Sequence, residues 1–163
     1  MLDYQIVTDP KTKKLSIQTS ITGKPLITIP QINKGTAFTR QERHQFALLG
    51  KLPHRVEKLQ EQVERAYAQY KAFDVQMNRN IYLRRLQDTN QVLFFKLVCD
   101  HLEELLPTIY TPIVGQAVQR FSLSFRQARG LYISYQDREY IPTILNNRSN
   151  PNIDLIVVSD GEG

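Results

Sequence analysis

The chain has 163 residues, 41% of them hydrophobic and 23% charged, and it carries a formal net charge of +5. This length and composition suit one globular domain with its own hydrophobic core. The sequence contains no tract of eighteen apolar residues and no N-terminal signal with an apolar centre, so it predicts a cytoplasmic protein without a membrane span.

Cysteine and charge exclude further classes of protein. The single cysteine, Cys99, rules out an internal disulfide and a four-cysteine metal site, and its apolar helical neighbours favour an inert core thiol. The 21 basic residues are interspersed with 16 acidic ones rather than clustered. Net charge alone therefore gives no prediction of a nucleic-acid partner.

Residues 1–35 are predicted to form a hairpin or an ordered N-terminal arm. Apolar and polar residues alternate loosely over residues 4–7 and 15–19, and Asp9-Pro10-Lys11 between them is a turn signal.

Residues 36–127 are predicted to be helical. Thr39 and Glu42 have the spacing of a capping box, which begins a helix of about three turns that Gly50 would end. Pro53 opens a longer segment whose apolar residues recur at three- and four-residue steps. They are Val56, Leu59, Val63, Ala66 and Tyr70.

Two more helices are expected to follow. Asp74 is a suitable N-cap for one that carries Met77, Ile81 and Leu86 inward. The other should run from about residue 90 to 105 and end where Pro107 disfavours helical geometry in the preceding residue. His101 lies on its apolar face without a metal-ligand partner at a suitable spacing, so a hydrogen-bonded structural histidine is expected.

Tyr110 is the candidate catalytic residue of the chain. It precedes Thr111-Pro112, which predicts a threonine N-cap and a proline at the first position of a helix over about 112–125. The tyrosine would lie at the positive end of the helix dipole, a position that suits a proton donor. The alternative is a structural tyrosine stapled to the fourth helical residue, but Gly115 there offers no side chain.

Residues 128–163 are predicted to begin an α/β part. Residues 131–135 are rich in strand formers, residues 137–147 suggest a short helix or link, and residues 153–158 read as a strand buried on both faces. The predicted fold class is therefore α+β, mostly helical, with the last strand in a small, mainly parallel sheet. Because that strand has few candidate neighbours here, we expect a fragment of a longer protein.

The order of several short motifs resembles the N-terminal domain of malic enzymes, most of all the bacterial NAD-linked group. The matching motifs lie at residues 33–39, 49–53, 88–90, 107–115, 129–134 and 157–162, and they include the specific block Y-T-P-I-V-G from Tyr110 to Gly115. The resemblance implies oxidative decarboxylation of malate to pyruvate with NAD and Mg2+ or Mn2+, by a dimer or tetramer. It makes Tyr110 the general acid that protonates enolpyruvate.

The resemblance also implies that the general-base lysine, the carboxylate metal ligands and the NAD-binding domain follow residue 163. The fragment alone is therefore expected to bind no metal or cofactor and to be inactive. Gly163 occupies the position of a family arginine that contacts the substrate carboxylate or cofactor region. Malolactic enzymes, which convert malate to lactate, resemble this chain at that position, but their tyrosine is typically followed by Asp-Pro rather than by Thr111-Pro112.

An alternative from another class is a non-catalytic, basic helical module for subunit assembly or nucleic-acid binding. The amphipathic segments between residues 39 and 90 motivate it. Nucleic-acid binding would weaken steeply with salt, which separates it from the enzyme hypothesis.

Overall fold

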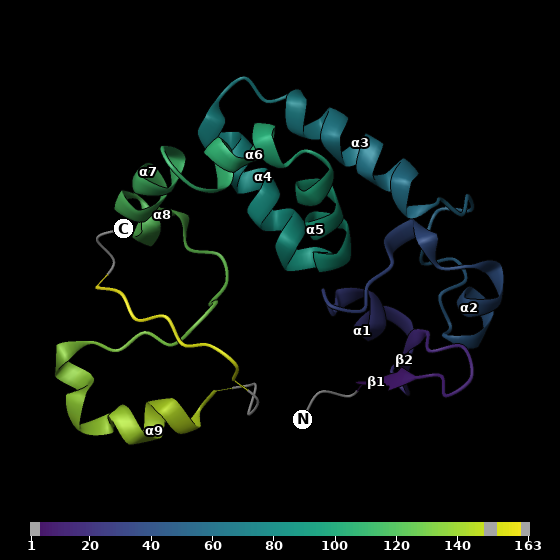
Figure 1. Ribbon diagram of the computed structural model, residues 1–163, viewed down its shortest axis with the longest axis horizontal. Coiled ribbons are helices and arrows are strands. Elements are labelled where there is room, and N and C mark those ends of the chain that lie inside the picture. The colour runs from purple at the N-terminus through teal and green to yellow at the C-terminus, as the bar shows by residue number, and fades with distance from the viewer. Residues whose placement is uncertain (1–3, 149–152, 161–163) are drawn as a thin grey trace.

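The computed structural model describes residues 4–148 and 153–160 and is mostly helical (Figure 1). Its elements in chain order are β1 (Tyr4–Thr8), β2 (Leu15–Thr19), α1 (Gly23–Thr28), the 3-10 helix η1 (Gly35–Ala37), α2 (Arg40–Gln45), α3 (Leu59–Lys71), α4 (Gln76–Thr89), α5 (Gln91–Asp100), α6 (Leu102–Ile109), α7 (Ile113–Gln119), α8 (Phe121–Ser124), the 3-10 helix η2 (Tyr135–Tyr140) and α9 (Ile141–Asn146). The mostly helical prediction is confirmed. None of the described helices is both long and apolar enough to cross a membrane.

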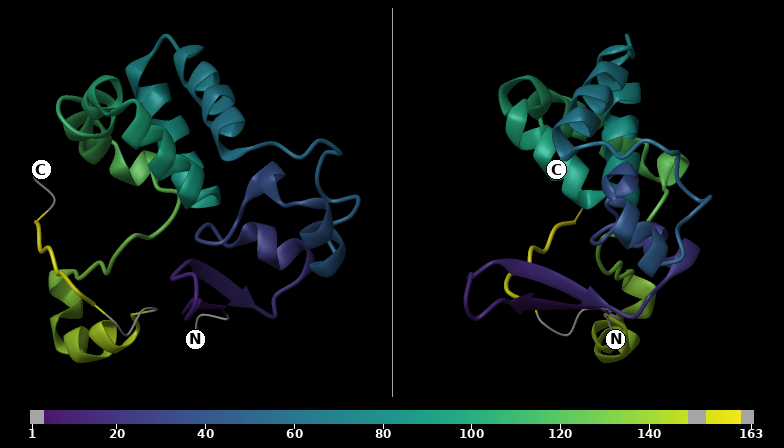
Figure 2. Two further views of the ribbon diagram at one scale, coloured as in Figure 1. Left: turned by 45° about the vertical axis from the view of Figure 1, so that its right-hand side comes forward. Right: turned by 90° about the vertical axis from the view of Figure 1, so that its right-hand side faces the viewer.

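The predicted hairpin is present. β1 and β2 pair antiparallel with Ile6 opposite Ile17, and the Asp9 carboxylate accepts hydrogen bonds from the backbone N–H groups of Lys11 and Thr12 in the turn. In both views of Figure 2 the hairpin lies below the α3–α6 helices. This antiparallel pair is the sheet that the described residues form; the parallel sheet expected near the C-terminus is not seen among them.

The first of two hydrophobic cores lies around α1 and α2. Its buried members are Leu26, Ile32, Phe38 and Leu48. The capping box at α2 is confirmed: Thr39 Oγ1 accepts from the Glu42 N–H, and Glu42 accepts from the Thr39 N–H.

The helix at α2 is shorter than predicted, because it ends before Gly50. Ala47 takes a left-handed backbone with φ of 54°, its N–H bonds to the His44 carbonyl, and the Leu48 N–H bonds to the Arg43 carbonyl at 2.8 Å. This is a Schellman termination with alanine where glycine is usual. Leu48, which follows the left-handed residue, is buried in the first core.

The second and larger core is enclosed by α3, α4, α5 and α6, which lie together in Figure 1. Its buried members are Val63, Ala66, Tyr70, Leu83, Leu93, Phe94, Leu97 and Leu105. The inward face predicted for α3 is thus confirmed at three of its positions, with Leu59 half-buried beside them. The start predicted at Pro53 was wrong, because residues 53–57 have no regular secondary structure and Val56 is exposed.

The boundaries of the next helices also differ from the prediction. α4 begins after Val75 rather than with an Asp74 cap, and its buried residues are Asn80 and Leu83, whereas Met77, Ile81 and Leu86 are half-buried. The single helix expected over 90–105 is divided at His101 into α5 and α6.

α6 continues through Pro107 to Ile109, contrary to the predicted end before this proline. A proline here removes one hydrogen bond to the Glu103 carbonyl, four residues earlier. Glu103 is exposed, so that carbonyl can bind water instead. The cost of the proline is therefore small enough for the helix to persist.

The helix predicted over 112–125 is interrupted at Arg120 and forms α7 and α8. The change in direction brings the Phe121 ring to 5.7 Å from that of Phe125 and 5.8 Å from that of Tyr132, measured between centroids. The contacts among these aromatic rings thus stabilise the chain where the predicted helix does not continue.

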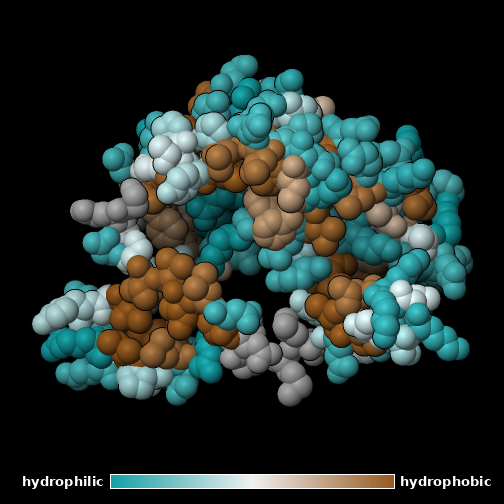
Figure 3. Space-filling view, viewed as in Figure 1, coloured by the Kyte–Doolittle hydropathy of each residue, from teal (hydrophilic) through white to brown (hydrophobic). Residues whose placement is uncertain are grey.

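The two strands predicted near the C-terminus are not formed. Residues 131–134 and 153–158 have no regular secondary structure, whereas the short helix expected near residues 137–147 is present as η2 and α9. Leu155 is 81% exposed and Val158 is 90% exposed. A strand requires hydrogen bonds from a neighbouring strand, and no described segment supplies them. Figure 3 shows the apolar side chains gathered over this part of the molecule.

Gly35 lies where the two cores meet. Its φ is +56°, and a Cβ atom at this position would lie 2.6 Å from Gln62 Oε1 on α3. Two further bonds join the cores: the Gln91 N–H donates to the Pro30 carbonyl at 2.9 Å, and the Asn33 side-chain amide donates to the Thr89 carbonyl at 2.8 Å. The motif around Gly35 thus fixes the first core against the second.

Candidate functional site

Tyr110 lies at the junction of α6 and α7. It is the C-cap of α6, where its N–H donates to the Leu106 carbonyl at 2.9 Å, and its own carbonyl accepts from the Val114 N–H at 2.8 Å. The side chain is 63% exposed. Its backbone is therefore bonded on both sides while the phenol remains accessible to a ligand.

The helix start after Tyr110 differs from the prediction. Thr111 is not the N-cap; Pro112 is, the peptide between them is cis, and α7 begins at Ile113. α7 has seven residues, so the expected long helix behind the phenol is absent from the described structure. The position of Tyr110 therefore depends on the end of α6 more than on a helix dipole.

A buried polar network fixes the end of α6, two residues before Tyr110. Thr108 is 1% exposed, and its hydroxyl lies 2.8 Å from the Tyr70 hydroxyl of α3 and donates to Gln76 Oε1 of α4 at 3.0 Å. Its carbonyl accepts from the Asn80 side-chain amide at 2.8 Å. Such groups are costly to bury unless they are hydrogen-bonded, so the network specifies one position for the last turn of α6.

On the other side of Tyr110, Ile113 is 6% exposed and anchors the start of α7. The tyrosine is thus held between a buried polar residue and a buried apolar one. Thr108, Gln76 and Asn80 were not predicted from the sequence. The available signal was a polar residue on the buried face of a helix, Asn80 in α4 and Thr108 in α6; Gln76 is exposed.

The other residues singled out from the sequence lie elsewhere. The His101 ring stacks on that of Tyr67 with centroids 3.7 Å apart and planes 7° apart, so its contact is a ring stack. Tyr67 donates a short hydrogen bond to Glu104, and this bond raises the pKa of the tyrosine. Cys99 is exposed, so the prediction of a core thiol was wrong; it lies on the outer face of α5. Gly163 lies outside the described residues.

The part of the chain that the structure describes contains no group of three or more His, Cys, Asp or Glu residues that could hold a metal ion. These residues therefore do not fit a divalent metal site, and none of them is assigned to a metal or to NAD.

Comparison with known proteins identifies the region that contains Tyr110. Residues 87–163 match the family model of the malic enzyme N-terminal domain. This region is therefore similar to that domain. The resemblance found in the motifs is thereby confirmed, and the match includes Tyr110 and the polar residue Thr108 that positions it.

Individual malic enzymes are similar over nearly the whole chain. The NAD-dependent malic enzyme of Acinetobacter baylyi is 49% identical over 154 residues, and those of Escherichia coli K12 and Shigella boydii serotype 18 are 50% identical over 155. Each alignment covers 94% of this chain but 27% of the relative. The chain thus spans about a quarter of the length of these enzymes.

Proposed function

We propose that this chain is the N-terminal part of an enzyme that oxidatively decarboxylates malate with NAD and a divalent metal ion. The similarity to NAD-dependent malic enzymes over 94% of the chain carries the proposal. The overall reaction converts malate and NAD+ into pyruvate, carbon dioxide and NADH.

Tyr110 is the residue of this chain that we assign to the chemistry. When the carboxylate is lost, the electron pair of the broken carbon–carbon bond remains on the three-carbon product as an enolate. Transfer of the Tyr110 hydroxyl proton to carbon 3 of this enolate forms the new C–H bond of pyruvate and leaves a phenolate on the tyrosine. A fixed backbone and an exposed phenol support this role, since a general acid must reach its substrate in a defined geometry.

Replacing Tyr110 by Phe in the full-length enzyme tests the assignment. The change removes one hydroxyl from an exposed side chain, so folding should be unaffected. We expect kcat to fall by about 100- to 10,000-fold, the usual effect of losing a general acid. The assay should follow pyruvate and NADH together, because lactate formed without net NADH would identify the malolactic reaction instead.

Tyr135→Phe is the matched control. Tyr135 is 80% exposed and its ring contacts Arg138, a contact that phenylalanine can retain. This variant should keep the turnover of the unmodified enzyme. Near-normal turnover in Tyr110→Phe, with the control also normal, contradicts the assignment of Tyr110.

We also propose that the full-length enzyme is a cytoplasmic homo-oligomer, a dimer or a tetramer. The basis is the resemblance to malic enzymes. Light scattering on the purified full-length enzyme should give the mass of two or four chains, and a monomer would contradict the proposal.

A further inference from the structure

A second site is indicated on the first core, where Arg43 of α2 is buried with no anionic partner in the part of the chain that the structure describes. Its side chain is 1% exposed, and its guanidinium donates five hydrogen bonds, all to backbone carbonyls. The acceptors are Thr36, Phe38, Pro53, His54 and Arg55. These bonds use every donor of the guanidinium, and no carboxylate of residues 4–148 or 153–160 forms an ion pair with it.

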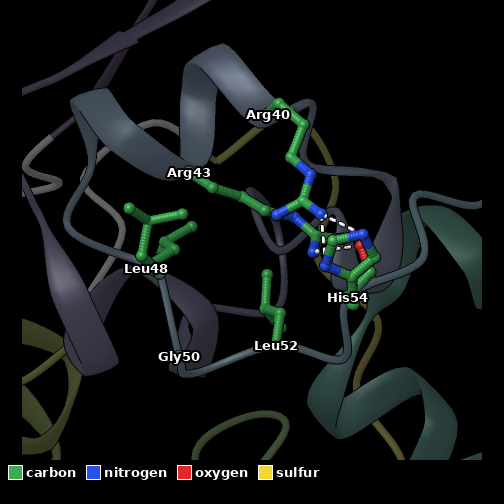
Figure 4. A pocket seen from close by; sticks show the side chains of 7 residues that line it. Arg40, Arg43, Leu48, Gly50, Leu52 and His54 are labelled. Atoms are coloured by element: carbon green, nitrogen blue, oxygen red, sulfur yellow. Dashed lines mark hydrogen bonds between the residues drawn. The ribbon is translucent and has the colours of Figure 1, made fainter.

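Arg43 thereby places His54 beside Arg40, one turn earlier on α2. Figure 4 shows the guanidinium groups of Arg40 and Arg43 converging on the imidazole of His54. Arg40 Nη2 contacts both ring nitrogens of His54, and among the described residues Arg40 has no ion pair. An imidazole cannot supply the negative charge with which an arginine forms its strongest hydrogen bonds, and Arg40 is exposed, so its guanidinium is accessible to an anion from solution.

The nearest acidic residues along the chain are committed to other cations. Glu42 is 2.6 Å from Lys34, Glu57 is 3.0 Å from Arg65, and Glu61 pairs with Arg55. The electrostatic potential around Arg40 and Arg43 is therefore positive and attracts an anion.

A pocket with two chemically different sides opens at this point. It has a volume of about 180 Å3, roughly that of six water molecules. Arg40, Arg43 and His54 form its polar side. Leu48, Leu49, Gly50 and Leu52 form the other side, with Leu48 and Leu52 shown in Figure 4.

We propose that this pocket binds a small carboxylate with a short apolar body, such as a four-carbon monocarboxylic acid. The carboxylate would accept hydrogen bonds from Arg40, whose donors are not otherwise paired with an acid, in the planar geometry that guanidinium groups favour. The carbon chain would lie on the leucines. Arg43 does not bind the ligand through its own donors; it positions His54 and supplies positive charge. The site is built on α2 and is separate from Tyr110, so it does not depend on the proposed reaction.

The test is calorimetric titration of the full-length protein with butyrate, with inorganic phosphate as the comparison. Unmodified protein should bind butyrate more tightly than phosphate. Arg40→Gln should weaken butyrate binding about tenfold or more, the effect of losing a hydrogen bond to a charged group. Leu52→Asn should weaken butyrate and leave phosphate unchanged.

Arg85→Gln is the control for net charge, since Arg85 is an exposed residue of α4 and the variant loses the same single charge. It should bind butyrate as the unmodified protein does. Three outcomes would overturn the proposal: no detectable butyrate binding, equal butyrate binding in Arg40→Gln and unmodified protein, or phosphate binding that is tighter than butyrate binding and lost in Arg40→Gln.

Discussion

Two buried polar residues, Arg43 and Thr108, each hydrogen-bond to several separate segments of the chain and hold them together. Arg43 connects residues 36–38 to residues 53–55 through carbonyls, and Thr108 connects the end of α6 to α3 and α4. Neither role was predicted from the sequence, because hydropathy patterns place apolar residues, and a polar residue on an apolar face, such as Thr108, was the one signal that it is buried. Arg43 lies within the motif that gave the correct capping box, yet it was assigned no role.

Replacing Arg43 by Met tests the first of these residues. Methionine fills much of the same volume but leaves five carbonyls without their donor, and the local free energy of opening should fall by about 3 kcal/mol or more. Hydrogen–deuterium exchange of the full-length protein should show amides in residues 36–55 exchanging at least about a hundredfold faster. Arg40→Gln is the control, since it removes a cation without breaking these bonds. Unchanged exchange in Arg43→Met would contradict the role.

Thr108→Val tests the second residue. Valine keeps the shape but loses the hydroxyl that bonds to Tyr70 and Gln76. If the network positions Tyr110, kcat of the full-length enzyme should fall about 10- to 100-fold, as expected from a small displacement of a catalytic group, with KM changed less. Thr143→Val in the exposed helix α9 should leave both constants unchanged. Equal kcat in Thr108→Val and unmodified enzyme would remove the positioning role.

At the scale of elements, patterns between residues close in sequence predicted the correct structures, but several predicted helix boundaries were wrong. The hairpin and the capping box were predicted because each depends on residues a few positions apart. The start of α3 was missed because its preceding carbonyls accept from Arg43, a contact distant in sequence. The division of α5 from α6 was missed because His101 stacks on Tyr67 of another helix. Tertiary contacts of this kind override local propensity.

The capping box of α2 predicts a dependence of local stability on pH. Partial burial raises the pKa of Glu42, but hydrogen bonds from Lys34 and the Thr39 N–H outweigh burial and lower it below 4.5. A depressed folded-state pKa means that the stabilisation is complete above about pH 4.5 and is lost as the pH falls through the folded-state value. Amide exchange in α2, corrected for intrinsic rates, should therefore accelerate at acidic pH. In Glu42→Gln this pH dependence should disappear; its persistence would contradict the assignment.

At the scale of the molecule, residues 4–124 contain both hydrophobic cores, and residues 125–148 and 153–160 contribute no buried residue to either core. α9 lies apart from the α3–α6 helices in Figure 1, connected by extended segments. The strand character predicted for residues 153–158 reflects their composition, and their exposure here reflects the lack of a pairing strand in the described chain. The composition of a segment predicts that it favours a strand, but it does not predict whether a neighbouring strand is present to pair with it.

This arrangement predicts a difference between the 163-residue chain and the full-length enzyme. Since the relatives are longer, we expect the additional chain to supply strands beside residues 153–158. Amides of residues 153–158 should exchange within the dead time in the short chain and be protected in the full-length enzyme. The short chain should also form no NADH from malate. Equal exchange of these amides in both proteins would contradict the expectation.

Gly35 has a consequence for how the two cores that carry the proposed sites contact each other. The carboxylate pocket lies on the first core and Tyr110 on the second, and Gly35 meets Gln62 of the second core with no room for a methyl group. The Gln62 amide also donates to the Lys34 carbonyl at 3.3 Å, so residues 34–35 contact a side chain of α3, the helix whose Tyr70 hydroxyl bonds to Thr108 at the last turn of α6. Because position 35 has no side chain, the backbone of the first core can approach the Gln62 amide of α3 closely, and a larger residue there would have to displace that amide from the boundary between the two cores.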